Sequence, residues 1–451
     1  MDTMTMCSSP AKVADYSRRA RPSLLDVIFA VVLFLTVTDL YRFGAVWARF
    51  NSLAPLTGAF ALAAFVYTLH YCRYSCLPLS RWMAWTTFLL VIPIASLVYS
   101  PNPNFRDVAL QVFYLSLLWG SKVFFSRPGT RSIHGILVDG ALAVGCAGVI
   151  LSIFKPELFA ALAQVNDRDM PYYHGRGYGF YLQPNVCAAS LTLLFFLWLF
   201  VRRPRRTSYV MVSLTYLLTT ILTGSRAGVV MAVFLVAFYP LLAGPGWNLA
   251  RLGARMVRVS LLGGVGLAIV VAAVFSAAPR LASGGVLETL KRVGGLLAYR
   301  ELLQQDASVR GRVDHVKDYM VKCYEQPFIG YGIASAPVMR AQGLLEAPSH
   351  NTFIEFAFTY GSVGILAWVV VVMMTWEDCR LLRSRFQYKI HVLFFGTLAL
   401  ACLASNTVLG NRILYVVLGW LLATRYTSQA AWKANNAALP TEAANEKATV
   451  E

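Results

Sequence analysis

Long apolar runs recur along almost the whole chain, and they limit its fold more than any other feature. Many approach the roughly 20 residues that an α-helix needs to cross a bilayer. Charged residues make up only 14% of the 451 positions, whereas a soluble chain carries about a quarter. The sequence therefore predicts an all-α polytopic membrane protein rather than a globular domain with one anchor.

Hydropathy predicts about twelve transmembrane helices, or about eleven if the short final run does not span. The predicted spans are 24–40, 53–71, 82–99, 107–125, 135–154, 183–201, 207–223, 227–244, 259–276, 351–375, 390–408 and 412–424. The chain is thus divided into an N-terminal tail (1–23), transmembrane helices one to nine (24–276), a large loop (277–350), transmembrane helices ten to twelve (351–427) and a polar tail expected to be disordered (428–451).

Clusters of basic residues predict the orientation. They lie at residues 18–21, 202–206, 251–258 and 380–389. With twelve spans all four fall on one side, as the preference of Lys and Arg for short cytoplasmic loops requires. Both termini are then predicted to be cytoplasmic. The same clusters account for much of the net charge of +18 without a nucleic-acid partner, since no basic stripe interleaves with aromatic residues on a soluble domain.

Three segments are predicted to face outward: 155–182, the tight turn near 224–226, and the loop 277–350. The loop contains an amphipathic stretch near 286–304 and a second helix-like stretch near 312–325. It is expected to form a cap, made partly of short helices, over an outward cavity.

Arginines in the outward segments are the first candidates for chemistry. Arg226 lies in the Thr-Gly-Ser-Arg turn between two apolar runs, and Arg310 and Arg312 lie in the large loop. A guanidinium presents a planar fork of donors that suits phosphate. The simpler interpretation is a tight helical hairpin with an arginine extending to the interface, and solvated arginines on the loop.

Two further segments carry polar groups beside glycine or proline. Arg176 lies in a glycine-rich loop before Asn185, whose side chain either caps the next helix or binds sugar hydroxyls. His350 and Asn351 precede the tenth span, in which Gly361 and Gly364 would permit close packing against a neighbour. Ser349 or Asn351 is suited to cap that helix, while an imidazole is the side chain whose ordinary pKa suits proton transfer near neutral pH.

The order of these motifs resembles that of the O-antigen ligase and polysaccharide polymerase superfamily of bacterial membrane proteins. The features that carry the resemblance are the segment 176–185, the Thr223–Arg226 turn, the Gly-Arg helix leading to the Pro327–Gly332 turn, and His350-Asn351 before a Gly-x-x-Gly helix. Members often have an aromatic residue four positions after the loop arginine, where this chain has Val316. Arg310 and Arg312 therefore both remain candidates, and the distance to Pro327 favours Arg312.

The resemblance implies a GT-C-like glycosyltransferase bundle in the inner membrane, working without a cofactor or metal. The donor would be an oligosaccharide on undecaprenyl diphosphate at the periplasmic face, with other polysaccharide assembly proteins as further partners. By the same resemblance, Arg226 and Arg312 would bind the diphosphate with help from Arg176. His350 would be the general base, and Asn185, Arg310 and Asn351 would support the site or bind sugar.

Three functions remain open from the sequence. The favoured one is a polymerase in exopolysaccharide or O-antigen synthesis. A ligase, which transfers the finished glycan to the lipid A core, is the alternative within the same superfamily. A polysaccharide or anionic-substrate transporter would also place arginines in an outward cavity, but the chain lacks the repeated halves common in transporters.

Overall fold

A computed structural model describes residues 21–47, 54–71, 79–100, 105–159, 176–181, 183–243, 307–333, 335–349, 351–380, 385–404 and 410–424. Every regular element in these ranges is a helix, and they contain no strand. The all-α prediction is therefore confirmed at this level. The predicted span 259–276 and the amphipathic stretch 286–304 lie outside the described residues.

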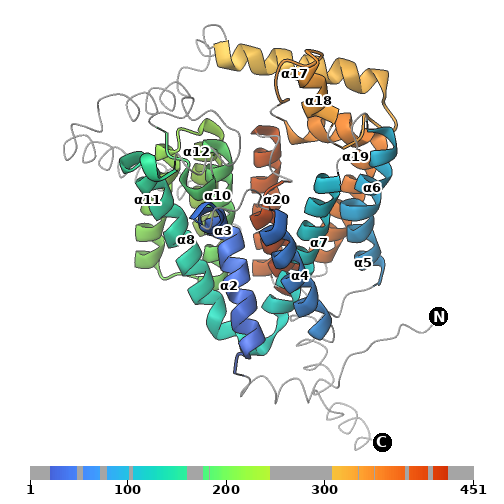
Figure 1. Cartoon of the computed structure of the whole chain (residues 1–451). Helices are drawn as coiled ribbons and strands as arrows, with labels where there is room; N and C mark the ends of the chain where they lie inside the picture. The colour runs from blue at the N-terminus through green and yellow to red at the C-terminus, as the bar shows by residue number, and fades with distance from the viewer. Residues whose placement is uncertain are drawn as a thin grey trace, which may run out of the picture.

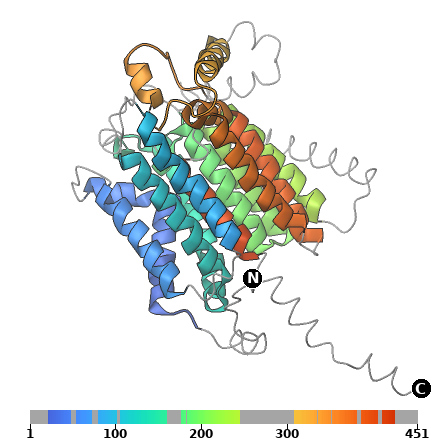
Figure 2. The ribbon, with the colours of Figure 1, turned by 90° about the vertical axis from the view of Figure 1, so that its right-hand side faces the viewer.

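The helices pack side by side as a bundle, and one helix lies across one end of it (Figures 1 and 2). The longer helices are α2 (Leu24–Thr38), α4 (Ala54–His70), α7 (Phe105–Ser126), α8 (Arg131–Phe154), α10 (Pro184–Arg202), α11 (Arg206–Leu222), α12 (Arg226–Ala243), α17 (Ala307–Glu325), α19 (Thr352–Arg380), α20 (Arg385–Ala404) and a final helix Arg412–Thr424. The shorter ones are α3 (Leu40–Trp47), α5 (Leu79–Thr86), α6 (Ile92–Ser96) and α18 (Ser335–Ala341). The end that α17 covers is called the α17 end below.

Among the described helices, four are long and apolar enough to cross a bilayer: Asp107–Ser126, Pro128–Phe154, Pro184–Arg202 and Thr352–Glu377. Five shorter apolar helices accompany them, at Leu24–Thr38, Ala54–His70, Arg226–Pro240, Lys389–Leu403 and Arg412–Thr424. These helices agree with a membrane protein, and most match a predicted span within a few residues. The count of twelve and the GT-C-like architecture stay predictions.

Helix α10 lies at the centre of the described bundle. Of its most apolar window, 83% is buried, and it contacts α8, α11, α12 and α20. Its side chains from Leu193 to Phe200 are all buried against these neighbours.

The predicted span 82–99 is not a single regular helix. α5 is followed by a π-helical turn (Thr87–Val91), then α6 and a 3₁₀ turn (Leu97–Tyr99). Pro93, in the first turn of α6, has no N–H to donate to the preceding turn. A widened turn at this point keeps the helix axis continuous.

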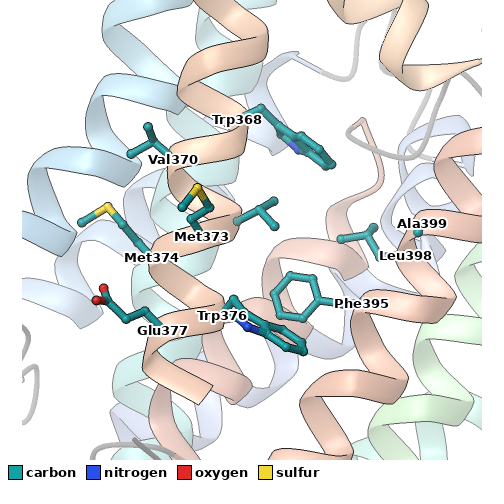
Figure 3. Close-up of a pocket in the computed structure, with 10 residues that line it drawn as sticks. Trp368, Val370, Met373, Met374, Trp376, Glu377, Phe395, Leu398 and Ala399 are labelled. Atoms are coloured by element: carbon teal, nitrogen blue, oxygen red, sulfur yellow. The ribbon is translucent and has the colours of Figure 1, made fainter. Parts of the chain in front are cut away.

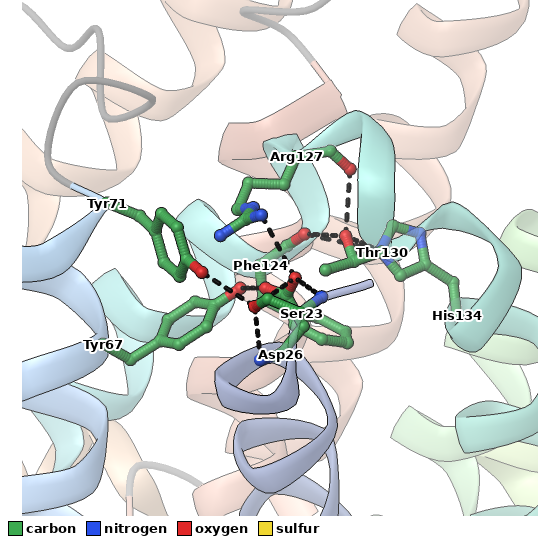
Figure 4. A network of polar contacts seen from close by, with 8 residues as sticks. All are labelled: Ser23, Asp26, Tyr67, Tyr71, Phe124, Arg127, Thr130 and His134. Atoms are coloured by element: carbon green, nitrogen blue, oxygen red, sulfur yellow. Dashed lines mark hydrogen bonds and ion pairs between the residues drawn. The ribbon is translucent and has the colours of Figure 1, made fainter. Parts of the chain in front are cut away.

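A buried polar network joins four helices at the end opposite α17 (Figure 4). Asp26 of α2 is fully buried and pairs with Arg127, just after α7, at 3.1 Å. Tyr67 of α4 donates a hydrogen bond to Asp26 at 2.8 Å, and the Arg127 guanidinium lies 3.4 Å above the Tyr71 ring. Ser23 completes a capping box with Asp26. A buried charge persists only when it is paired and hydrogen-bonded, so this network fixes these helix ends.

Candidate functional site

The Thr-Gly-Ser-Arg motif forms the tight turn between α11 and α12. Gly224 has a φ of 64°, a conformation that glycine adopts without strain. Thr223 and Ser225 are buried, and the Ser225 N–H donates to Thr223 Oγ1 at 3.2 Å. The Ser225 hydroxyl accepts the Gly228 N–H at 3.2 Å, which caps α12. The predicted hairpin is therefore present, with Arg226 as the first residue of the second helix.

Arg226 is half-buried at this helix start. A helix N-terminus carries a partial positive charge, so the guanidinium and the helix end both favour an anion at the same place. Two residues on, a Cβ built on Gly228 would lie 2.3 Å from the Ala188 Cβ of α10. The absence of a side chain at Gly228 thus lets α12 approach the central helix closely.

Arg176 binds the backbone of this same turn. Its Nε donates to the Thr223 carbonyl at 3.0 Å and its Nη2 to the Gly224 carbonyl at 3.3 Å. The next residue, Gly177, donates its N–H to the Leu222 carbonyl at 2.8 Å. Two motifs that are far apart in the sequence are thereby brought together. The contacts give Arg176 the role of holding the turn that carries Arg226.

Asn185 does not cap α10, so that interpretation is wrong. The helix begins at Pro184, and Gln183 is its N-cap with extended backbone and no side-chain cap bond. Proline is favoured at the first helical position because its φ is already helical and its missing N–H is not needed there. Asn185 is half-buried in the first turn, and its role toward sugar stays a prediction.

The helix-like stretch predicted at 312–325 is part of α17, which begins five residues earlier at Ala307. Arg310 and Arg312 both lie within this helix. Residues two apart on a helix lie about 200° apart around its axis, so the two arginines occupy different faces of α17. Their side chains are not among the described parts of the structure, and both stay candidates.

The Pro327–Gly332 turn is hydrogen-bonded to a kink in α19. Gly361 lies within α19 at φ 61° and ψ −160°, which breaks the regular helix. Tyr331 and Gly332 donate their N–H groups to the Phe358 and Thr359 carbonyls, each at 2.9 Å. The backbone groups freed by the kink are thus satisfied by the turn.

A second pair of hydrogen bonds is donated by α19 to the Pro327–Gly332 turn. Ser362 donates its N–H to the Pro327 carbonyl at 2.8 Å, and Val363 donates to the Phe328 carbonyl at 3.2 Å. A Cβ built on Gly361 would lie 2.4 Å from the Phe328 carbonyl carbon and oxygen. The predicted close packing at Gly361 is therefore confirmed, and its partner is the turn that follows α17.

Both motif groups lie at the α17 end. α7 and α8 are joined by a short turn, so the start of α7 and the end of α8 lie at one end of the bundle. Ser100, shortly before α7, donates its hydroxyl to the Ile333 carbonyl at 2.6 Å. Ser152, near the end of α8, accepts the N–H groups of Tyr178 and Gly179 at 3.1 and 3.2 Å. The Arg176 loop and the turn after α17 therefore share this end (Figure 1).

His350 lies outside the described residues, but both its neighbours are held by hydrogen bonds. Asn351 Oδ1 accepts the N–H groups of Phe353 and Ile354 at 2.9 and 3.2 Å. The predicted cap of α19 is therefore confirmed for Asn351. Ser349 is fully buried and donates its hydroxyl to Glu355 Oε2 at 2.9 Å. Glu355, four residues after the cap, was not predicted as a site residue. Its only sequence feature is that it is an acidic residue in a first helical turn.

The end of α17 carries a small charged cluster outside the bundle. Glu325 accepts hydrogen bonds from Lys322 Nζ at 2.8 Å and from the Tyr331 hydroxyl at 2.7 Å. These bonds, Lys322 first, lower the pKa of Glu325. Burial and the bond to Glu325 raise the pKa of Tyr331 to about 12. The cluster joins the last turn of α17 to the Pro327–Gly332 turn.

A cavity of about 620 Å³ lies between α19 and α20 (Figure 3). It is lined almost wholly by apolar side chains: Trp368, Val370, Val372, Met373, Met374, Trp376, Phe395, Leu398 and Ala399, with Glu377 at its edge. Met373 and Val370 are well exposed, so the cavity opens at the surface of the bundle. Its one ionisable lining group is Glu377, which pairs with Arg81 at 3.3 Å.

Metal-binding residues do not gather in the part of the chain that the structure describes. Nowhere in it do three His, Cys, Asp or Glu side chains lie in an arrangement that would hold an ion.

Part of the chain that contains these motifs matches a known protein family. Residues 211–369 match the family described as O-antigen ligase. This range contains the Thr223–Arg226 turn, α17, the Pro327–Gly332 turn and the kinked start of α19. A search of curated proteins finds no match. The resemblance inferred from the order of the motifs is confirmed for this part of the chain, which makes up about a third of its length.

Proposed function

We propose that the chain is a membrane glycosyltransferase that polymerises glycan repeat units carried on undecaprenyl diphosphate. The reaction would take place on the periplasmic face of the bacterial inner membrane, with both termini in the cytoplasm. The observation that carries the proposal is the bonding of Arg176 to the turn that bears Arg226, at the bundle end that also holds α17. Arg176 and Arg226 thereby lie together at the bundle end where α17, the helix that contains Arg310 and Arg312, is found.

The leaving group of such a donor is an anionic lipid diphosphate. Negative charge on it grows as the glycosidic C–O bond breaks, and preorganised cations stabilise that charge more strongly in a site shielded from water. Arg226 and Arg312 are proposed to do this, with Arg310 as the alternative on α17. Arg176 contributes by fixing the turn. This assignment needs no metal ion, which predicts activity in the presence of a chelator.

His350 is proposed as the general base. It would take the proton from the acceptor hydroxyl as that oxygen attacks the anomeric carbon, while the diphosphate leaves with the bonding electrons. A single displacement of this kind inverts the configuration. The hydrogen-bonded neighbours Ser349 and Asn351 restrict the backbone on both sides of His350.

The test uses purified protein in liposomes with a lipid-linked repeat unit. His350→Ala should abolish transfer and leave donor binding intact, and Arg226→Gln should weaken donor binding. A matched control is Arg81→Gln, whose partner Glu377 is exposed and lies away from the site. If His350→Ala transferred sugar at the wild-type rate, the assignment of the base would be wrong.

A deletion strain separates polymerase from ligase. Loss of a polymerase leaves single repeat units, whereas loss of a ligase leaves full-length chains on the carrier lipid. If the glycan profile were unchanged and no lipid-linked intermediate accumulated, a transporter or another non-enzymatic function would replace the proposal.

A further inference from the structure

A second cationic cluster lies where α2 ends. Asp39, the residue after α2, adopts the left-handed conformation with φ 57°, which Asp tolerates better than most residues. Its carboxylate accepts a hydrogen bond from Arg412 Nη1 and lies 3.5 Å from Arg42 Nε. Arg412 begins the final helix. The cluster therefore joins the first described helix to the last.

The charges in this cluster do not balance. Two guanidinium groups share one carboxylate, and the three side chains are only 8–19% exposed. The rings of Tyr41 and Phe113 lie 5.0 and 6.0 Å from the Arg412 guanidinium, and Arg412 Nε has no hydrogen-bond partner among the described residues. The faces of these rings attract the cation but do not neutralise it, so the cluster keeps one positive charge more than its carboxylate offsets.

The final helix connects this cluster to the Arg226 turn through α10. Asn411, next to Arg412, donates its side-chain amide to Ser190 Oγ at 2.9 Å. Ser190 is two residues from Ala188 on α10, and Ala188 is the residue against which Gly228 packs. The Arg412 cluster and the Arg226 turn therefore lie at the same level of the bundle, on different sides of α10.

The Arg176 segment provides a second connection. Tyr181, five residues after Arg176, donates its hydroxyl to the Val37 carbonyl at 2.9 Å, just before Asp39. Phe180 packs edge-to-face on Phe43 of α3, with ring centroids 5.9 Å apart. One short segment thus contacts the Arg226 turn and two residues close in sequence to Asp39 and Arg42.

We propose that Arg42 and Arg412 bind a phosphate of the acceptor glycolipid, while the Arg226 turn binds the donor diphosphate. The inference rests on the proposed function, because a transfer between two lipid-linked glycans brings two anionic headgroups to one enzyme face. Two separate cationic groups at one level of the bundle match two such headgroups.

A substitution of Arg42 tests whether the cluster binds phosphate or only joins the two helices. The Asp39–Arg412 pair already joins α2 to the final helix, so its loss would unfold the cluster as well as remove a ligand. Arg42 is three residues from Asp39 on the neighbouring helix, and the bridge between the two helices does not need it. Arg42→Gln therefore removes the excess charge while keeping the bridge.

Binding is measured on the full chain in nanodiscs by native mass spectrometry, with undecaprenyl diphosphate as the probe. Wild type should bind two molecules, and Arg42→Gln and Arg226→Gln one each. Arg42→Lys, which keeps the charge, and the control Arg81→Gln should bind two.

One bound lipid in wild type, or two in Arg42→Gln, would overturn the proposal. In the transfer assay Arg42→Gln should raise KM for the acceptor about tenfold, as expected for one lost charge-assisted contact, and leave KM for the donor unchanged. An equal rise for both substrates would also overturn it. Two bound lipids without any transfer would refute the proposed function but not the second phosphate site.

Discussion

The sequence gives Asn351 two candidate roles, as a helix cap and as a sugar-binding residue. The structure shows the contacts of the first role. Its side-chain oxygen caps α19 through two backbone N–H groups. A cap of this kind contributes about 1 kcal/mol to stability. The amide nitrogen is not needed for the cap, so the capping role and a sugar-binding role can be separated by substitution.

Asn351→Asp should keep most of the transfer activity, because a carboxylate oxygen caps the helix as the amide oxygen does. Asn351→Ala should lower the free energy of unfolding by about 1 kcal/mol and reduce activity several-fold as the start of α19 loosens. Thermal unfolding and initial rates in liposomes check both. Wild-type stability together with lost activity in Asn351→Asp would show instead that the amide group contacts sugar.

Glu325 gives a pH-dependent prediction outside the membrane. Since hydrogen bonds from Lys322 and Tyr331 lower its folded pKa, its contribution to stability is complete above the ordinary Glu pKa of about 4.3. That contribution is lost as the pH falls through the lower folded value. In protein labelled at the glutamate carboxyl carbons, the Glu325 signal, assigned with Glu325→Gln, should titrate below the other exposed glutamates.

Tyr331→Phe should raise the pKa of Glu325, because it removes one donor while Lys322 remains. Phe358→Leu, which changes a neighbour stacked on the Tyr331 ring without removing a hydrogen bond to Glu325, is the control. An unchanged Glu325 titration in Tyr331→Phe would mean that the Tyr331 bond does not form in solution.

At the scale of residues, the sequence predicted local turns and helix caps better than contacts between residues far apart in the chain. The small residues of the Thr223–Arg226 turn and the cap at Asn351 follow from local rules for turns and helix ends, and both were found. Asp39 and Arg412 are separated by 373 residues. No local pattern relates such a pair, and the contact becomes visible only once the helices are placed.

At the scale of elements, the kink in α19 accounts for two glycine motifs at once. Gly361 breaks the helix, and the Pro327–Gly332 turn replaces the missing bonds. The Gly-x-x-Gly pattern predicted a close approach here, but the approach is backbone to backbone and not helix to helix. The hydropathy of this segment shows one continuous apolar run, so it does not predict the kink at Gly361.

Gly361→Ala should destabilise the protein strongly. An alanine at this φ costs about 1–2 kcal/mol, and its Cβ would also overlap the Phe328 carbonyl. Gly58→Ala is the matched control, since a Cβ there meets nothing within 4 Å and alanine is favoured in helices by about 0.5–1 kcal/mol. Thermal unfolding in detergent compares the two. Equal unfolding temperatures for Gly361→Ala and wild type would rule out the kinked backbone.

At the scale of the whole molecule, the alternating direction of successive helices and the positions of the basic clusters predict one orientation of the chain in the membrane. In a cysteine-free background, a cysteine in place of Tyr324, which is 79% exposed on α17, should react with a membrane-impermeant maleimide in cells with a permeabilised outer membrane. A cysteine in place of Arg205, exposed before α11 at the other end, should react only after the inner membrane is opened. The reverse pattern would invert the topology and remove the proposed periplasmic site.

The Asp39–Arg412 pair also has a consequence for biosynthesis. The partners lie 373 residues apart, so at about 5–20 residues per second the ribosome makes Arg412 roughly 20–75 s after Asp39. During this time Arg42 is the near partner of the carboxylate in the inserted helix pair. A nascent chain that stops short of the final helix therefore lacks Arg412, and its Asp39 carboxylate has only Arg42 of this cluster as a partner.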